Sequence, residues 1–224
     1  MRVINSYHNI PKADRGSAVA IGNFDGVHLG HQSVIDVART AASQAKAPLG
    51  VLTFEPHPRA YFAPQTPAFR LMSPVARQNR LTKLGVEYLY ELPFNDSLAA
   101  LTPEQFAREV ISEGLGLTHV VIGQDFCFGK ARAGTAEDLL HFGEKMGFGV
   151  SIAPLLATKG AQVSSTAIRT ALSEGRPQDA AAMLGHWHRL EGAVQHGEKR
   201  GRELGFPTAN MHLTDLHLPK FGVY

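Results

Sequence analysis

The sequence has little cysteine, little net charge and no long apolar run, and each shortage excludes a class of protein. The single cysteine, Cys127, excludes an intrachain disulfide and favours a reducing cytoplasm. The formal net charge of +2 provides no basic stripe, so we expect no nucleic-acid partner. No run approaches the ~20 apolar residues of a membrane span, and the first residues lack the apolar core of a signal peptide, so we expect no membrane association.

The rest of the composition is typical of a globular protein. The chain has 224 residues, 44% of them hydrophobic, which suits one large domain or one domain and part of another. Apolar runs predict strands at Ala18–Ile21, Leu49–Phe54, Val86–Leu92, His119–Ile122 and Gly149–Ala153. Helical patterns lie between them at His31–Ala45, Ser73–Leu84, Thr102–Leu115 and Thr135–Met146. This alternation predicts an α/β fold, a doubly wound parallel sheet with helices on both faces.

A glycine-rich loop with two histidines follows the first predicted strand. Residues 22–31 read GNFDGVHLGH, and a helical pattern begins there. The free N–H groups and the positive dipole end of that helix lie beside His28 and His31, an arrangement that suits a polyphosphate. Gly30 lets phosphate oxygens approach the backbone, and the imidazoles can donate hydrogen bonds to developing charge. The motif resembles the signature of nucleotidyltransferases that act on the α-phosphate of a nucleoside triphosphate.

Two alternatives remain for the histidine pair. His28 and His31 could be zinc ligands, although no cysteine or second histidine pair stands nearby at ligand spacing. They could also be solvated residues in the first turn of a helix, without a function. Motifs that follow other predicted strands favour the phosphate site.

Two of these motifs lie at the carboxyl ends of strands, where parallel sheets bind ligands. His57 and Pro58 belong to a loop that two prolines fix, which could also be purely structural. Asp125, Phe126 and Phe128 follow the fourth predicted strand. Exposed aromatic rings suit a flat ligand, although these rings could equally fill the core.

A third motif combines hydroxyl groups with an arginine. Residues 164–169 read SSTAIR. Ser164, Ser165 and Thr166 can cap a helix, and capping alone would explain them. With Arg169 close behind, the same segment makes a second phosphate clamp, able to hold a leaving pyrophosphate.

Together, the motifs at 22–31, 53–58, 123–129 and 164–169 resemble the adenylyltransferase module of bacterial bifunctional riboflavin kinase/FAD synthetases. The resemblance covers essentially the whole chain. It implies a reaction in which FMN attacks ATP to give FAD and pyrophosphate, with Mg²⁺, and it implies small-molecule substrates as partners. Since the FMN phosphate is itself the nucleophile, the protein chiefly positions the reactants and neutralises charge.

The resemblance also assigns roles to residues. His28, His31 and Arg169 would be catalytic. ATP would be bound by Gly22, Asn23, Phe24, Asp25, Gly30, Ser164, Ser165 and Thr166. The flavin would lie near His57, Pro58, Asp125, Phe126 and Phe128. Cys127 and Ala167 stand where the family often has basic residues.

The C-terminal part changes character after residue 185. Glycine turns lead to residues 207–210, which read PTAN and resemble the start of the riboflavin kinase module, a β-barrel that acts on riboflavin. In that module Thr208 and Asn210 would bind Mg²⁺ and ATP. Out of this context, a Gly/Arg-rich turn is more typical of a solvated hairpin.

We therefore expect an FMN adenylyltransferase domain at 1–185 and an incomplete N-terminal part of a riboflavin kinase domain at 186–224, since these residues are too few to close a barrel. Kinase activity is expected in a full-length chain. Cleavage near Gly185–Arg189 is expected to leave adenylyl transfer intact.

Two other functions remain open. Another nucleotidyltransferase with the same histidine motif would not need the PTAN element. A flavin or nucleotide carrier without catalysis would not need His28, His31 and Arg169 together. The composition sets no oligomeric state.

Overall fold

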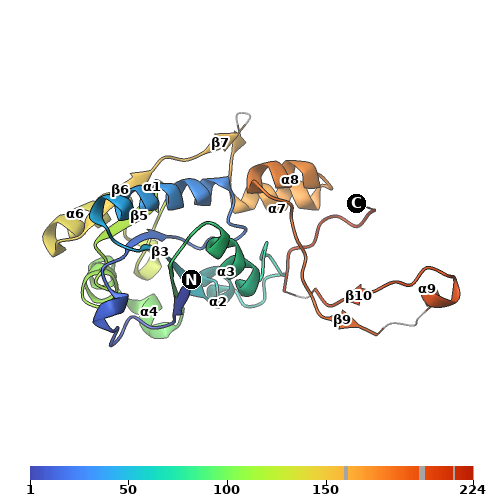
Figure 1. Ribbon diagram of the computed structural model, residues 1–224, viewed down its shortest axis with the longest axis horizontal. Coiled ribbons are helices and arrows are strands. Elements are labelled where there is room, and N and C mark those ends of the chain that lie inside the picture. The colour runs from blue at the N-terminus through green and yellow to red at the C-terminus, as the bar shows by residue number, and fades with distance from the viewer. Residues whose placement is uncertain (159–160, 197–199, 214, 224) are drawn as a thin grey trace.

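The apolar segments assemble into one six-stranded parallel sheet at the centre of the structure, a computed structural model that describes residues 1–158, 161–196, 200–213 and 215–223 (Figure 1). In spatial order the strands are β1 (Arg2–Ile4), β4 (Tyr88–Pro93), β3 (Leu49–Glu55), β2 (Ala18–Ile21), β5 (His119–Gly123) and β6 (Gly149–Ala153). Every neighbouring pair is parallel. The predicted α/β sheet is thus confirmed, with β1 as an addition at the edge: three residues carry too little pattern to be detected.

The two faces of the sheet bury separate cores. Ala18 and Ala20 point to the face covered by α1 (Leu29–Ala45) and α3 (Pro74–Lys83). Val19 and Ile21 point to the opposite face, covered by η2 (Phe106–Ser112) and α6 (Ala136–Met146). Because successive side chains of a strand alternate between faces, helices on both sides leave the central strands apolar throughout.

The helices begin and end where local chemistry predicts. Ser73 Oγ accepts the Ala76 N–H at 3.1 Å at the start of α3, and Pro74 follows as the first helical residue. Gly147 closes α6 in the left-handed conformation. The helix predicted at 102–115 is instead a short α5 (Pro103–Gln105) that continues into η2, a π-helix.

The order of the strands changes direction between β2 and β5. The chain passes from β2 to β3 and β4 on one side, then crosses back to β5 and β6 on the other. At such a switch point the loops after two adjacent parallel strands separate and leave room for a ligand. The histidine motif follows β2, and the loop with Asp125 follows β5, so the fold places both at this point.

The remaining elements are short or belong to the C-terminal part. They are η1 (Lys12–Asp14), α2 (Pro58–Phe62), α4 (Asp96–Ala100), η3 (Lys130–Arg132), β7 (Ala157–Thr158), β8 (Ala161–Gln162), α7 (Ser165–Ser173), α8 (Pro177–Leu184), β9 (Val194–Gln195), α9 (Arg200–Glu203) and β10 (Asn210–Met211). Strands β9 and β10 pair in an antiparallel hairpin that projects away from the sheet (Figure 1). Within the described residues, no helix is both long and apolar enough to cross a membrane.

Candidate nucleotide site

The loop between β2 and α1 makes a tight turn that aims the histidine motif. Phe24, Gly26 and Val27 all have positive φ angles, of 50°, 87° and 43°. Asp25 is buried, and its Oδ1 accepts the Leu71 N–H at 2.8 Å. Ser165 Oγ donates to the Asp25 carbonyl at 2.8 Å. Two segments that are distant in the sequence thus hold the turn. Their hydrogen bonds stabilise its strained backbone, in which non-glycine residues have positive φ angles.

His28 and His31 lie against each other at the start of α1. Their rings stack with centroids 3.6 Å apart and an interplanar angle of 15°. His28 Nδ1 accepts the His31 N–H at 3.2 Å and so caps the helix. An Nδ1 that accepts cannot carry the proton in a neutral ring, so the proton of His28 is on Nε2. His28 therefore has one N–H that remains available to a ligand.

Both imidazoles are neutral near pH 7. Burial lowers the pKa of His28 to about 4, and the positive charge of Arg169 acts in the same direction. Burial and His28 together lower the pKa of His31 well below its usual value. Phe24 contributes to this burial, because its ring lies 5.0 Å from that of His31. The pair consequently offers neutral hydrogen-bond donors instead of two cations.

Arg169 reaches this turn from α7 and is incompletely paired. Its Nη2 lies 3.7 Å from Asp25 Oδ2, outside hydrogen-bond distance. Within the described residues, Arg169 Nε, Arg169 Nη1 and Asp25 Oδ2 are buried without a hydrogen-bond partner. Burial lowers the pKa of the guanidinium and raises that of the carboxyl. Buried polar groups without partners are costly, so these atoms mark a place that a ligand can complete.

The first turn of α7 faces the first turn of α1. Ser164 Oγ caps α7 by accepting the Ala167 N–H at 3.1 Å, as capping alone would require. A Cβ on Gly30 would lie 3.3 Å from the Val163 carbonyl and 3.1 Å from the His28 ring, so the glycine permits this close approach. The positive ends of two helices converge, with the exposed Thr166 beside them. Backbone N–H groups and side chains together make this a candidate anion site.

A second group of residues joins the site through Phe69. His57 caps α2 by accepting the Arg59 N–H at 3.0 Å, and Pro58 is the first residue of that helix. The His57 ring meets the buried Phe69 ring edge-on at 5.0 Å. The guanidinium groups of Arg59 and Arg169 lie 4.7 and 5.7 Å from the same ring. Burial, then Arg70, Arg169 and Arg77, lower the pKa of His57 to about 4.

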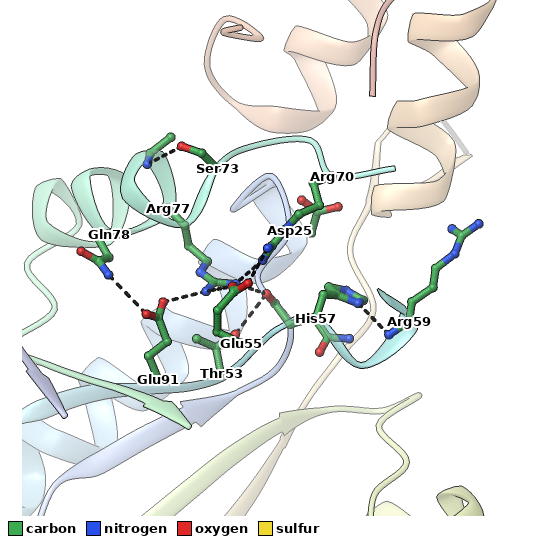
Figure 2. Close-up of polar contacts among 12 residues, drawn as sticks. Asp25, Thr53, Glu55, His57, Arg59, Arg70, Ser73, Arg77, Gln78 and Glu91 are labelled. Atoms are coloured by element: carbon green, nitrogen blue, oxygen red, sulfur yellow. Dashed lines mark hydrogen bonds and ion pairs between the residues drawn. The ribbon is translucent and has the colours of Figure 1, made fainter. Parts of the chain in front are cut away.

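Beneath these loops lies a buried network of ion pairs (Figure 2). Arg77, 1% exposed, donates through Nη2 to Glu55 at 3.0 Å and to Glu91 at 2.7 Å. Arg70 binds both carboxylate oxygens of Glu55 at 2.6 Å. Burial raises the pKa of the Glu55 carboxyl, but Arg70 and Arg77 outweigh burial and hold that pKa below its usual value. The network ties the ends of β3 and β4 to α3.

Arg77 also supports the first motif. Its Nη1 lies 3.4 Å from the Asn23 carbonyl, which accepts the Thr53 hydroxyl at 3.2 Å as well. Gly22 donates its N–H to the Leu52 carbonyl at 3.1 Å. The sequence analysis did not select Arg77. The sequence does contain a sign of its burial: Arg77 stands four positions before Leu81, which places a charged residue on the buried face of α3.

The aromatic residues after β5 divide between core and surface. Phe128 is 6% exposed and packs against Phe106, with ring centroids 5.7 Å apart. Phe126 is half-buried and stacks on Phe128 at 5.6 Å, while Asp125 is exposed. The core alternative therefore describes Phe128, which supports Phe126 from below. Phe126 and Asp125 remain the residues of this group that are open to a ligand.

Thr208 and Asn210 lie apart from the histidine motif along the chain and in the fold. Asn210 is in β10, on the hairpin that projects from the sheet (Figure 1). Both side chains are exposed. They belong to a second candidate site, which the structure does not join to the first.

Comparison with known proteins matches two family models to two segments of the chain. The family model for FAD synthetase matches residues 10–167, and the family model for riboflavin kinase matches residues 184–224. A bifunctional riboflavin kinase/FMN adenylyltransferase from Pseudomonas fluorescens is 39% identical over 100% of this chain and 72% of its own. The Bacillus subtilis protein of the same name is 37% identical over 100% of this chain and 71% of its own.

The chain belongs to the bifunctional riboflavin kinase/FMN adenylyltransferase family. The resemblance inferred from the motifs is thereby confirmed. A similar solved structure, a crystal structure of a Streptococcus pneumoniae protein described as a macrolide-efflux protein, is 34% identical with a TM-score of 0.86. It covers 99% of this chain and 72% of its own. That description belongs to the neighbour, whereas the fold is common to both.

The buried network gives a prediction for stability. In Arg77→Met, the carboxylates of Glu55 and Glu91 lose a buried partner, so we expect the free energy of unfolding to fall by about 3–5 kcal/mol. Lys145→Met removes an exposed ion pair with Glu104 and should leave stability unchanged. Urea unfolding followed by circular dichroism measures both variants. Equal midpoints for the two variants would contradict the assigned role of Arg77.

The lowered histidine pKa values give a prediction for pH dependence. Between about pH 4 and the usual pKa of 6.5, the unfolded chain binds protons that native His28 and His57 do not. Stability should therefore fall as pH decreases through 6.5, by up to about 2 kcal/mol per histidine at pH 5. His57→Asn retains an acceptor for the Arg59 N–H and should flatten the decline. Parallel stability curves for the two proteins would contradict the lowered pKa of His57.

Proposed function

We propose that the site transfers the adenylyl group of ATP to FMN, giving FAD and pyrophosphate. The observation that carries the proposal is the stacked, neutral His28–His31 pair beside the incompletely paired guanidinium of Arg169, where two helix N-termini converge. Family membership supports the choice of FMN as acceptor.

In the proposed reaction, an oxygen of the FMN phosphate attacks the α-phosphorus of ATP. The new P–O bond forms as the bond from the α-phosphorus to the bridging oxygen breaks, and pyrophosphate leaves with that electron pair. His28 Nε2–H is placed to donate to the charge that develops on the transferring group, and His31 supports the His28 ring by stacking. Preorganised donors of this kind stabilise a transition state without reorganising.

Arg169 and the start of α7 would hold the β- and γ-phosphates. The first main-chain hydrogen bond of α7 runs from the Ile168 N–H to the Ser164 carbonyl at 3.0 Å, so the N–H groups of Ser165 and Thr166 precede it. The Ser164 and Ser165 hydroxyls already serve as cap and tether. The segment would then bind phosphate through its backbone, the Thr166 hydroxyl and the guanidinium.

The surrounding loops would form the two halves of the pocket. Gly22, Asn23 and Phe24 would shape the nucleotide side, where Asp25 fixes the turn. On the flavin side, His57 and Pro58 would act with Asp125 and the half-buried ring of Phe126. In this proposal Phe128 contributes as the support of Phe126.

We also propose that residues 1–185 are the adenylyltransferase domain and that residues 186–224 belong to the riboflavin kinase domain. The hydroxyl of Thr208 and the amide oxygen of Asn210 are hard donors of the kind that Mg²⁺ prefers, and both side chains are exposed. Bound there, Mg²⁺ would neutralise nucleotide phosphate charge during phosphorylation of riboflavin. The single, free Cys127 supports a cytoplasmic location.

Two His28 variants separate catalysis from helix capping. His28→Asn retains an acceptor for the His31 N–H but loses the Nε2–H donor, whereas His28→Ala loses both. We expect both variants to reduce the turnover of pyrophosphate release from ATP and FMN by about 10²–10³-fold. His28→Ala should also lose about 0.5–2 kcal/mol of stability through the missing cap. Near-normal turnover in His28→Asn would contradict the donor role.

Arg169 gives a prediction for ligand binding. Arg169→Ala should weaken ATP binding about 10–100-fold, the loss typical of a charged hydrogen bond, and should leave FMN binding unchanged. Calorimetric titration with each ligand measures this, with the exposed Arg176→Ala as the control. An equal loss for ATP and FMN would show that Arg169 acts by seating α7.

A further inference from the structure

Two stretches of the C-terminal part return to the nucleotide site. The first directly follows α8. The last residue of that helix, Leu184, accepts a hydrogen bond from Gln32 Nε2 through its carbonyl at 3.0 Å. The second follows β10: Leu216 is 5% exposed and forms a β-bridge with Arg70, and the Lys220 N–H donates to the Leu172 carbonyl at 2.9 Å. Both stretches lie within the segment that matches the riboflavin kinase family.

Histidines of these stretches meet main-chain carbonyls of the nucleotide site. His186 Nε2 lies 3.1 Å from the Gly26 carbonyl and its Nδ1 lies 2.9 Å from the Trp187 carbonyl, so the tautomer with its proton on Nε2 donates to Gly26. Burial and then His217 lower the pKa of His188, whose Nε2 is buried without a hydrogen-bond partner among the described residues. The Gly26 carbonyl belongs to the turn that holds Asp25.

His217 makes the most direct of these contacts. Its main-chain N–H donates to the Arg70 carbonyl at 2.8 Å. Its Nε2 lies 3.1 Å from the Arg169 carbonyl and 3.1 Å from Ser173 Oγ, so the Nε2 proton is directed at α7. One residue of the kinase segment thus connects Arg70, the ion-pair partner of Glu55, with the helix that carries Arg169.

The residues that are held in this way are those on which the site depends. Arg70 binds the Glu55 carboxylate, the Leu71 N–H binds Asp25, and Gly26 lies in the turn with positive φ. The Leu71 side chain packs with Ile168 in a small core that α7 and α8 form. Displacement of the histidines would free α7 and the 69–72 segment to move relative to the β2–α1 turn.

We propose that His217, together with His186, positions the adenylyl-transfer site, so that the kinase segment holds Arg169 and the Asp25 turn in register. The proposal rests on the proposed function, in which Arg169 binds the ATP phosphates. It also revises the expectation that cleavage near Gly185–Arg189 leaves adenylyl transfer intact. Removal of residues 186–224 would remove both His186 and His217.

Substitution of His217 in the whole chain tests the proposal. We expect His217→Ala to raise the KM for ATP about 3–10-fold, the loss typical of one hydrogen bond, with little change in the KM for FMN. His217→Gln places an amide N–H near the position of Nε2 and should restore the KM for ATP. His196→Ala, at an exposed histidine of the same segment, is the matched control and should change neither constant.

The outcomes distinguish this proposal from the proposed function. An unchanged KM for ATP in His217→Ala, with Arg169→Ala still impaired, would overturn the positioning role alone. If Arg169→Ala itself binds ATP normally, the role of Arg169 fails, and with it the reason for positioning it. A lowered melting temperature in His217→Ala with equal changes in both KM values, or no rescue by His217→Gln, would show a merely structural contact and would also overturn the proposal.

Discussion

The candidate nucleotide site depends on one buried cation, the guanidinium of Arg77. It lies under the loops that end β2, β3 and β4 and contacts the Asn23 carbonyl, Glu55 and Glu91. A buried charge is tolerated only when its partners surround it, so the positions of these three groups are mutually constrained. Arg70 extends the same constraint to the segment that holds Asp25. The loops that follow β2, β3 and β4 are in this way fixed to one another.

This arrangement creates a positive potential that the chain does not fully neutralise. Arginines 70, 77 and 169 all act to lower the pKa of His57, and Arg169 acts in the same direction on His28. An arriving triphosphate would compensate the guanidinium of Arg169 and leave the histidines as neutral donors.

The sequence predicted the parts of this design that have a local cause. Five of the six strands follow from apolar runs, and the caps Ser73 and Thr102 were recognisable because a proline follows each. The histidine motif was recognisable because its residues are contiguous in the sequence. The Arg77 network was not, because its charges come from three distant segments and pair only after the sheet has formed. Phe128 could not be assigned from the sequence, because a phenylalanine after a strand suits a flat ligand as well as the core. Its packing against Phe106 shows that it belongs to the core.

The same argument explains why a boundary drawn from sequence understates the connection between the two parts of the chain. Composition changes after residue 185, and the hairpin of β9 and β10 projects on its own (Figure 1). Yet a hydrogen bond to a main-chain carbonyl depends on the position of the accepting residue and not on its identity. No sequence pattern therefore predicts such a bond. The imidazole of His217 reaches the Arg169 carbonyl across 48 positions of the chain. In the positioning role that we propose for His217, this contact sets the orientation of α7 and its arginine, and adenylyl transfer would then depend on residues that match the riboflavin kinase family.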